Sequence, residues 1–589
     1  MTPLDTIDIT AGAAQWLTAL DNALASGDSS AVTALFVDDG HWRDILVLGE
    51  RLTTASGRDR ITALLDETAG TPRPVNFRLA EGRTPPRLVT RNGRQVVELL
   101  FTCDAAWGPA AGMVRLLATE EGLRGWSCMA ALQDLSAEYD DLGEARLPEY
   151  ERLFGGPTWK DQRARARAYL DHDPAVLVVG GGQAGLAAAA RLTNMGIDTL
   201  VIDRQKRTGD NWRNRYDALV LHNQTNMNHL PDMPFPDSWP NYIPKDKLAN
   251  WFEIYAEAME INTWNETEIV AASHDEASGF WDITVKSAQH GERHLRPRHV
   301  IFATGVSSIP TAPKMPGLET FEGQVVHSAE FHDGRDWSGK PVVVVGTGNS
   351  AHDVAQDLAA NGALVTMIQR SPTYVISLAE AQKLYTLYNE GLPLEDTDLI
   401  SSGTPFPVLL EACQALTERA RKVDTPLLEG LVAKGFRIEF GPDDSGFQPM
   451  YLRRGGGYYF NLGCSDLIVD GTIKVVNAAD VQGLAGSGLQ MSDGTLIPAE
   501  LVVFATGFKN QQETVRAILG DSFADRVGEV WGLDDTGELK NMWCRTAQPG
   551  LWFTGGGLGQ CRIYSKYLAL QIRRELAMYS ARQQAQAAE

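Results

Sequence analysis

Two glycine-rich loops, each after a run of apolar residues, limit what this chain of 589 residues can fold into. The first loop, Gly180–Gly185, follows Ala175–Val179, and the second, Gly346–Ala351, follows Val342–Val345. Each loop precedes a helical pattern and another apolar run, which is the order of a βαβ dinucleotide-binding unit. Glycines at such a turn let a pyrophosphate approach the backbone at the helix N-terminus. One such loop is weak evidence, but the pair predicts two Rossmann-type units in an α/β fold.

The residues that close the two units differ in charge. Asp203 ends the second apolar run of the first unit, where a carboxylate suits a free ribose diol, as in FAD or NAD. Gln369 holds the equivalent position in the second unit and carries no charge. The next residue, Arg370, can pair with the 2′-phosphate of NADP. The sequence therefore predicts that one chain binds two different dinucleotides.

Length, charge and cysteine usage restrict the class of protein. A chain of this length predicts about three to four domains. The net charge of −22, from 75 acidic and 53 basic residues, argues against nucleic acid and anionic membrane surfaces as partners. We expect neither a membrane-spanning helix nor a signal peptide, because the required apolar runs are missing. The six cysteines form no CxxC pair, which favours free thiols in a reducing, cytoplasmic location.

Residues 1–136 carry no dinucleotide signal and predict a separate α+β domain. Helical patterns come first, and strand-like runs follow them. The predicted helices are Ala14–Leu24, Ser30–Phe36 and Arg58–Glu67, and the predicted strands are Val75–Leu79, Gln95–Thr102, Met113–Ala118 and Gly125–Leu132. This order resembles the NTF2-like, or SnoaL-like, fold.

That fold hosts isomerases and dehydratases, so His41 and Asp44 are candidates for a buried acid/base pair. The alternative, which we favour, is that they hydrogen-bond a helix–strand junction while the domain assists assembly or covers a neighbour.

The remaining pattern predicts a dinucleotide domain inserted into another. Residues 137–173 are a linker with helical stretches, and Thr158–Asp161 begins a helix. The predicted first domain is 174–335 plus 490–589, and the predicted second domain is 336–489 with a helical insertion at 376–460. Two similar strand ends, Ala303–Gly305 and Ala505–Gly507, mark the places where the chain returns from one domain to the other.

A motif between the loops carries a family resemblance. Phe321, Gly323, His327 and Phe331 match the pattern FxGxxxHxxx(Y/F), and the chain from Ala175 onward resembles the flavin-containing monooxygenases. The resemblance is to N-terminally extended bacterial members, which are related to Baeyer–Villiger monooxygenases. It implies FAD at the first loop and NADP (NADPH) at the second, in an NADP-binding domain inserted in a FAD-binding domain.

The loops, the strand ends and the resemblance together give a set of expected cofactor contacts. In the family, a Trp-Arg segment and a glycine loop near the C-terminus lie against the flavin. The expected contacts are Gly180, Gly182, Gln183, Ala184, Gly185, Asp203, Arg204, Trp212, Arg213, His222, Thr304, Gly305, Gly346, Thr347, Gly348, Asn349, Ser350, Arg370, Ser371, Thr506, Gly507, Gly555 and Gln560. No Cys/His cluster has metal-ligand spacing, so no metal site is expected.

His222 is the expected catalytic residue, with Asn223 as the alternative if the alignment slips by one position. Many amine- and sulfide-oxygenating members carry asparagine there. An imidazole can donate to a flavin peroxide or, if charged, stabilise its anion. Dedicated Baeyer–Villiger enzymes have a related motif ending in tryptophan, whereas this chain has Phe331 followed by His332. Oxygenation of a ketone and oxygenation of nitrogen or sulfur therefore both stay open.

The resemblance implies an NADPH- and O₂-dependent enzyme that forms a C4a-(hydro)peroxyflavin and transfers one oxygen atom to a small organic substrate. A flavin disulfide reductase is set aside because it needs a cysteine pair beside the flavin. The other alternative is a binding or scaffold flavoprotein whose N-terminal domain recognises a ligand. NTF2-like domains often associate, so we expect a homodimer.

Overall fold

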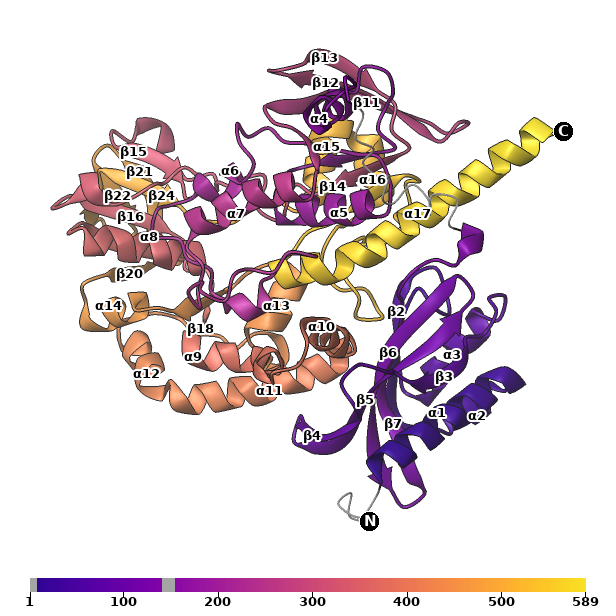
Figure 1. The fold of residues 1–589 in the computed structure, drawn as a ribbon. Helices are drawn as coiled ribbons and strands as arrows, with labels where there is room; N and C mark the ends of the chain where they lie inside the picture. Colours follow the sequence, from indigo (N-terminus) through magenta and orange to yellow (C-terminus); the bar gives the residue numbers. More distant parts are fainter. Residues whose placement is uncertain (1–7, 140–153, 589) are drawn as a thin grey trace.

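The computed structural model describes residues 8–139 and 154–588, which form an N-terminal domain, two further sheet units and a set of helices between them (Figure 1). Residues 140–153 of the predicted linker lie outside the described residues. In the described part of that linker, helix α4 (Trp159–Ala168) begins where predicted, because the side chains of Thr158 and Asp161 cap each other's backbone N–H groups.

The N-terminal domain packs three helices against a seven-stranded sheet. The helices are α1 (Ile9–Ser26), α2 (Ser29–Thr33) and α3 (Arg58–Glu67). The strand order is β2-β1-β7-β6-β5-β3, with β4 paired to β5: β1 (Phe36–Ile45), β2 (Leu52–Ser56), β3 (Val75–Leu79), β4 (Arg87–Arg91), β5 (Arg94–Ala105), β6 (Gly108–Thr119) and β7 (Gly122–Leu132). Trp16, Phe36, Trp42 and Phe101 are buried between helices and sheet.

The structure corrects the predicted start of this sheet. Phe36, predicted as the end of a helix, begins β1, and β1, β2 and β4 were all missed. The polar run Asp38–Gly40 reads as a turn in the sequence. In the fold, β2 and β7 pair with β1 on its two sides, and the register shifts between Phe36 and His41. A local irregularity of this kind accommodates the polar run inside a strand.

The first glycine loop belongs to a parallel sheet of order β10-β9-β8-β14-β25: β8 (Val176–Val179), β9 (Thr199–Ile202), β10 (Asn262–Trp264), β14 (His299–Phe302) and β25 (Leu551–Phe553). Strands β8, β9 and β14 are buried along their whole length, as expected for short apolar runs covered on both faces. Helix α5 (Gln183–Asn194) packs against the long C-terminal helix α17 (Leu558–Ala588).

The second glycine loop belongs to another parallel sheet, of order β15-β24-β16-β17-β20: β15 (Gln324–His327), β16 (Pro341–Val345), β17 (Leu364–Gln369), β20 (Lys474–Asn477) and β24 (Leu501–Phe504). Helix α8 (Asn349–Ala360) follows the loop. This sheet extends beyond the predicted segment 336–489, because β15 precedes that segment and β24 follows it. The boundaries predicted at 335/336 and 489/490 therefore cut one hydrogen-bonded sheet.

The segment after β17 is mostly helical and also contains two short strands. Its helices are α9 (Leu378–Ala381), α10 (Leu394–Ser402), α11 (Phe406–Val423), α12 (Thr425–Ala433), α13 (Phe447–Arg454) and α14 (Cys464–Asp470). Two short strands at its ends, β18 (Tyr374–Ser377) and β19 (Tyr458–Asn461), pair in parallel.

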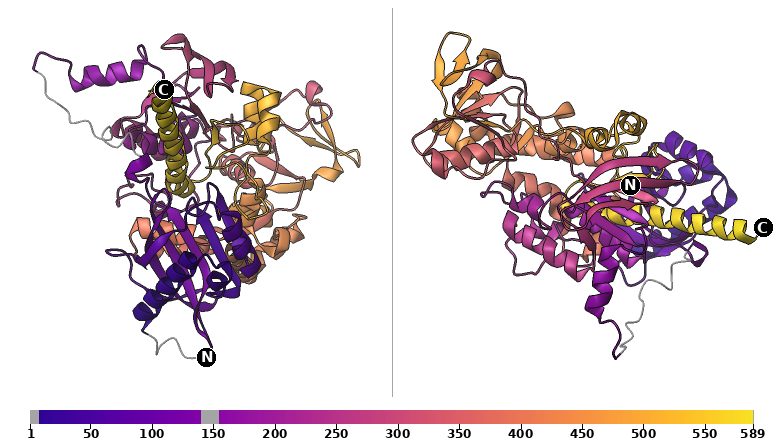
Figure 2. Two further views of the ribbon diagram at one scale, coloured as in Figure 1. Left: turned by 90° about the vertical axis from the view of Figure 1, so that its right-hand side faces the viewer. Right: turned by 90° about the horizontal axis from the view of Figure 1, so that it is seen from above.

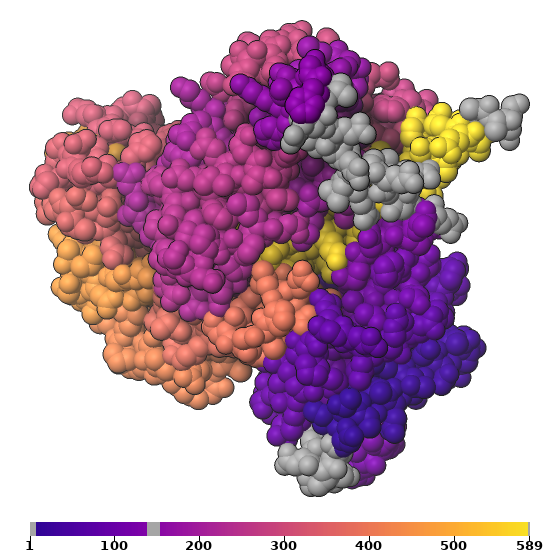
Figure 3. Space-filling model, in the orientation of Figure 1, coloured from indigo at the N-terminus to yellow at the C-terminus, as the bar shows by residue number. Residues whose placement is uncertain are grey.

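The N-terminal domain packs against this helical segment and against α17 (Figures 1 and 2). Met113 and Met129 of its sheet share a buried cluster with Leu399 of α10 and with Tyr567 and Leu570 of α17. In the space-filling view the domain and the helical segment meet along one continuous surface (Figure 3). Their buried apolar contact makes the N-terminal domain an integral part of the fold.

The other helices and strands flank these units, and several contribute to the buried core of the first one. They are α6 (Asp210–Arg213), α7 (Lys245–Ala258), α15 (Gln511–Leu519), α16 (Asp521–Val527), β11 (Thr267–Asp275), β12 (Phe280–Ser287), β13 (Gly291–Leu295), β21 (Val481–Ala485), β22 (Gly488–Met491) and β23 (Leu496–Pro498). Across residues 8–139 and 154–588, no helix combines the length and apolarity that crossing a membrane requires.

Candidate functional site

The first glycine loop has the close packing of a dinucleotide turn. Gly180 has φ +113°, and a Cβ there would lie 2.6 Å from the carbonyl oxygen of Ala303. A Cβ on Gly185 would lie 1.9 Å from the carbonyl oxygen of Gly180. Only glycine fits at these two positions, so helix α5 can approach β8 closely and present its N-terminus to a ligand. Gly182 and Ala184 lie between them, at the start of α5.

Asp203 lies at the carboxyl end of β9, beside this loop. Its Oδ2 accepts a hydrogen bond from the backbone N–H of Gly181 at 2.5 Å, and its Oδ1 accepts from the N–H of Gln205 at 2.7 Å. The carboxylate is therefore fixed in position against the loop. Arg204, the next predicted contact, is exposed.

Three buried polar atoms around the first loop have no hydrogen-bond partner among the described residues. They are Oδ1 of Asn211, Oγ1 of Thr304 and Oε1 of Gln511. Buried polar atoms are normally paired, so these three fit a bound molecule that carries hydroxyl and phosphate groups. Thr304 was predicted; Asn211 and Gln511 were not, because an amide in a helix has no distinctive sequence signal.

The loop before α17 joins the first glycine loop through side-chain amides. Nε2 of Gln183 donates to the carbonyl oxygen of Gly556 at 3.3 Å, and its Oε1 accepts from Nε1 of Trp212 at 3.2 Å. Oε1 of Gln560 accepts from the N–H of Gly557 at 3.1 Å and from the hydroxyl of Tyr451 at 3.0 Å. Residues far apart in the chain thus meet at one place.

Two further predicted contacts lie at the edges of this region. Gly555 is buried beside Gln511, whose Nε2 is 3.7 Å from where a Cβ of Gly555 would lie. Arg213 is an ion-pair partner of Asp210 and donates to Oδ1 of Asn250 at 3.2 Å.

The second glycine loop repeats the geometry with one variation. Gly346 has φ +123°, and a Cβ there would lie 2.5 Å from the carbonyl oxygen of Ala505 but 3.7 Å from the Cβ of Ala351. The last position of the loop therefore has room for a methyl group. Two loop side chains bond neighbouring segments: the hydroxyls of Thr347 and Thr373 are 2.7 Å apart, and Oδ1 of Asn349 accepts from the N–H of Phe460 at 3.0 Å. Gly348 and Ser350 lie at the first turn of α8.

The structure corrects the interpretation of Gln369 as the residue that faces a ribose. Gln369 is fully buried, and its amide donates to the carbonyl oxygen of Arg437 at 2.8 Å and accepts from its N–H at 2.7 Å. The guanidinium of Arg437 donates to the carbonyl oxygen of Arg370 at 2.6 Å. Two arginines therefore meet at the carboxyl end of β17, where Arg370 and Ser371 are exposed. Sequence reasoning missed Arg437 because it lies in the helical segment.

Two side chains of the first unit contact the second, one at helix α8 and one at strand β19. The hydroxyl of Tyr216 donates to Oδ2 of Asp353 at 2.7 Å. The ring of His222 packs edge-on against Phe460, with centroids 5.6 Å apart. Nδ1 of His222 is buried with no partner among the described residues. This atom is available to a ligand between the two units.

Burial lowers the pKa of His222, and the nearby Asp353 carboxylate opposes that shift. The imidazole is therefore neutral at neutral pH and can act as a hydrogen-bond donor. Asn223, the alternative catalytic residue, contributes its backbone: its carbonyl oxygen accepts from Nδ2 of Asn228 at 2.9 Å.

The Phe321–Phe331 motif contains β15 and lies next to the two segments that cross between the units. Its His327 packs against the ring of Phe508 with centroids 5.1 Å apart, and Phe331 is buried in the core of the second unit. The crossing segments bond each other: the N–H of Thr311 donates to the carbonyl oxygen of Gly507 at 2.9 Å, and the hydroxyl of Thr506 donates to the backbone carbonyl oxygen of Thr311. Gly305 and Gly507 both have positive φ, so glycine suits these turns.

His41 and Asp44 do not form an acid/base pair. They lie three residues apart on one strand, where side chains alternate between faces. Nδ1 of His41 is 3.0 Å from the hydroxyl of Ser56, and the Asp44 carboxylate accepts from the N–H groups of Leu48 and Gly49 at 2.9 and 3.2 Å. The favoured structural role therefore holds, within a strand and its following turn. Among the described residues no cluster of His, Cys, Asp and Glu suits a metal ion.

The two loops, facing units and unpaired buried polar atoms define a two-dinucleotide flavoenzyme. Residues 174–513 match the flavin-binding monooxygenase-like family, and the chain belongs to that family; it is a flavin monooxygenase. The indole-3-pyruvate monooxygenase YUCCA1 of Oryza sativa subsp. japonica is 30% identical over 353 residues, which cover 59% of this chain and 80% of that protein.

Solved structures share the fold. The open crystal structure of cyclohexanone monooxygenase has a TM-score of 0.51 at 18% identity, over 70% of this chain and 88% of that one. The crystal structure of an OTEMO complex with FAD and NADP has a TM-score of 0.50 at 16% identity, over 70% of this chain and 87% of that one. The fold outside the N-terminal domain is therefore that of flavin monooxygenases with Rossmann-type units.

Proposed function

We propose that this enzyme uses FAD and NADPH to insert one atom of O₂ into a carbonyl compound, in the manner of a Baeyer–Villiger reaction. For a ketone the balance is ketone + NADPH + H⁺ + O₂ → ester + NADP⁺ + H₂O. The observation that carries this assignment is the pair of glycine loops in one chain, with Asp203 fixed against the first and Arg370 and Arg437 at the second. Bound FAD supplies the redox chemistry between NADPH and O₂.

The chain's own residues position the cofactors and control protons. Gly180–Gly185, Thr304 and Gly555 suit the phosphates and ring of FAD, with Asp203 on its ribose. Gly346–Ser350 suit the phosphates of NADPH, with the guanidinium of Arg370 on the 2′-phosphate and that of Arg437 beside it. His222 donates a hydrogen bond from its neutral imidazole to the reacting oxygen between the units.

A carbonyl substrate is favoured by the names of the related proteins. One is an indole-3-pyruvate monooxygenase and another a cyclohexanone monooxygenase, and both named compounds contain a ketone group. Oxygenation of sulfur or nitrogen is the second candidate, supported by the phenylalanine that ends the Phe321–Phe331 motif.

We also propose that residues 8–136 are an NTF2-like domain, because three helices cover one face of its sheet. The paired strands suggest a revised second domain of about 324–504, inside a FAD-binding domain. Six free cysteines suit a reducing, cytoplasmic location. The predicted homodimer stays a prediction.

Stoichiometry tests the function. Purified protein with bound flavin should consume NADPH and O₂ and form an ester from cyclohexanone in equal amounts, measured by absorbance, an oxygen electrode and gas chromatography. NADPH consumption that yields only hydrogen peroxide with ketones, yet yields a sulfoxide from a thioether, would favour the second candidate. A colourless protein that consumes no NADPH would support the binding or scaffold alternative.

A further inference from the structure

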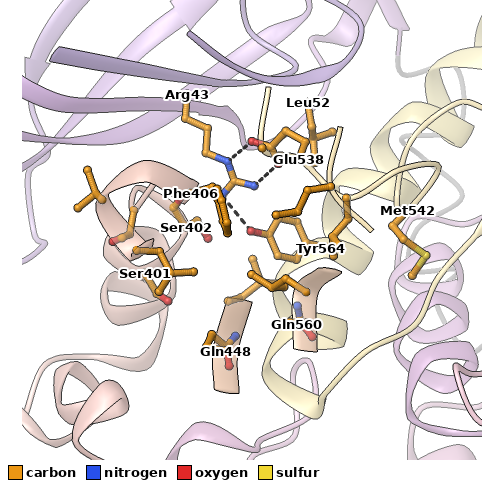
Figure 4. A pocket seen from close by; sticks show the side chains of 18 of the residues that line it. Arg43, Leu52, Ser401, Ser402, Phe406, Gln448, Glu538, Met542, Gln560 and Tyr564 are labelled. Carbon is orange, nitrogen blue, oxygen red and sulfur yellow. Dashed lines mark hydrogen bonds and ion pairs between the residues drawn. The ribbon is translucent and has the colours of Figure 1, made fainter. Parts of the chain in front are cut away.

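A cavity of about 1140 Å³ lies where three parts of the chain meet (Figure 4). The N-terminal domain contributes Arg43 and Leu52, the helical segment contributes Phe406 and Gln448, and the start of α17 contributes Gln560. The related proteins match this chain over its flavoprotein part, so a wall from the N-terminal domain is a feature to explain from this chain itself.

A buried ion pair between the N-terminal domain and the loop before β25 lines one end of the cavity. The guanidinium of Arg43 donates to both carboxylate oxygens of Glu538, at 2.7 and 2.6 Å. It also donates to the carbonyl oxygen of Ser402 at 2.6 Å and to the hydroxyl of Tyr564 at 2.9 Å. Through these four hydrogen bonds Arg43 holds the wall in place, with Leu52 beside it as an apolar surface.

The other end has an oriented hydrogen-bond donor. Because Oε1 of Gln560 already accepts from Gly557 and Tyr451, its amide cannot flip, and Nε2 is the end available to a ligand. Gln560 follows the glycine loop whose Gly556 carbonyl is bonded by Gln183 of the first dinucleotide loop. This end of the cavity therefore adjoins the proposed flavin site.

The walls between these ends combine charged side chains with an apolar stretch from the helical segment. The helical segment provides Leu384, Leu387, Phe406, Leu409, Leu416 and Leu452. Ligand pockets usually have volumes of about 300–1,000 Å³. This cavity exceeds that range, so it has room for a molecule much larger than cyclohexanone.

We propose that this cavity is the substrate chamber, an inference that rests on the proposed function. The chamber takes a long-chain or otherwise extended apolar ketone. The N-terminal domain limits the length of that ketone. The ketone oxygen accepts a hydrogen bond from Nε2 of Gln560, and the apolar chain points toward Leu52. Burial of each methylene adds to binding, so a long chain gains affinity that cyclohexanone lacks.

Steady-state kinetics with cyclohexanone and 2-undecanone test the length limit. We expect the wild-type kcat/KM to be at least about tenfold higher for 2-undecanone, as a few buried methylenes would give. Leu52→Trp should lower the ratio of the two kcat/KM values about tenfold, because an indole fills the space of several methylenes. Leu88→Trp is the matched control, since Leu88 is also half-buried in the N-terminal domain but lies outside the cavity wall.

Leu52→Ala covers the case in which the tryptophan variant does not fold. It should extend the preference to 2-pentadecanone. A ratio that changes equally in the Leu52 and Leu88 variants, or in neither Leu52 variant, would overturn the proposal.

A second substitution tests the carbonyl end. Gln560→Met should raise KM for both ketones about tenfold, the size of one hydrogen bond, and raise KM for NADPH much less. Equal increases would contradict contact with the ketone.

Binding separates this proposal from the proposed function. The tryptophan fluorescence of the flavin-loaded enzyme should change on titration with 2-undecanone, because Trp543 lines the cavity. If the enzyme binds 2-undecanone in this way but oxygenates no ketone, the proposed reaction fails and the chamber stands. If it oxygenates cyclohexanone but neither binds nor prefers 2-undecanone, the chamber fails and the reaction stands.

Discussion

The ion pair between Arg43 and Glu538 gives the sharpest energetic prediction. Both side chains are about nine-tenths buried, and the carboxylate also accepts from the hydroxyl of Thr54 at 2.8 Å. Burial lowers the pKa of Arg43, but the Glu538 carboxylate and the Tyr564 hydroxyl outweigh it and raise the pKa well above its ordinary value, so the guanidinium stays charged. Removing one partner leaves the other charge buried.

Arg43→Met removes both hydrogen bonds from the guanidinium to Glu538 and leaves the carboxylate with Thr54 alone. The expected cost is about 3–5 kcal/mol, the usual range for an uncompensated buried charge. Arg43→Met combined with Glu538→Met replaces both charges by apolar side chains of similar length. That double variant should lie within about 1–2 kcal/mol of the wild type, because removing both partners avoids the unpaired charge.

Hydrogen exchange by mass spectrometry measures the opening free energy of each segment separately, so two-state unfolding of a multidomain chain need not be assumed. The opening free energy of the peptide that contains β1 should fall in the Arg43 variant and recover in the double variant. The β8–α5 peptide of the first dinucleotide unit serves as the internal control and should change in neither. An equal loss in the single and double variants would refute the charge-burial argument.

Three further predictions concern protonation and cofactor binding. Burial raises the pKa of Asp44 to about 7 in the folded chain, so the native state binds an extra proton between about pH 4 and pH 7. The N-terminal domain therefore loses stability as the pH rises through this range. Calorimetry should show lower stability at pH 7.5 than at pH 5.5, and Asp44→Asn should reduce that difference. Because the pKa of His222 is lowered, the kcat profile above pH 6.5 should show no ionisation from this residue, and His222→Ala should lower product formed per NADPH; an unchanged ratio would dismiss its role. Arg370→Ala should raise KM for NADPH about tenfold or more while changing KM for NADH little, as loss of a charged hydrogen bond predicts. Arg582→Ala, an exposed residue of helix α17, is its control, and equal effects on both nucleotides would exclude a 2′-phosphate contact.

Sequence patterns sufficed for the dinucleotide units because their signals are local. Gly180, Gly185 and Gly346 stand where a Cβ would overlap backbone atoms, so the spacing of glycines records tight packing directly. The domain boundaries could not be predicted as well. Strands β15 and β24 join the second sheet by hydrogen bonds between residues far apart in the chain, and pairing of this kind leaves no local trace.

Some residues around the site could be placed from the sequence, and others only from the tertiary structure. Asp203 follows its strand at a fixed distance from its loop, so the sequence alone placed it beside that loop, where its carboxylate accepts from the N–H of Gly181. Arg437 reaches the end of β17 only through the buried amide of Gln369, and the Arg43 wall of the cavity depends on docking of the N-terminal domain.

By itself the sequence indicated two dinucleotide-binding units, because turns that approach a pyrophosphate require glycine at set positions. The resemblance of the Phe321–Phe331 motif pointed to the flavin monooxygenases. Only the tertiary structure decided which side chains face each other between the units and that the N-terminal domain walls a cavity beside Gln560. Those contacts join segments that are distant in sequence, and burial, rather than spacing, selects their residues.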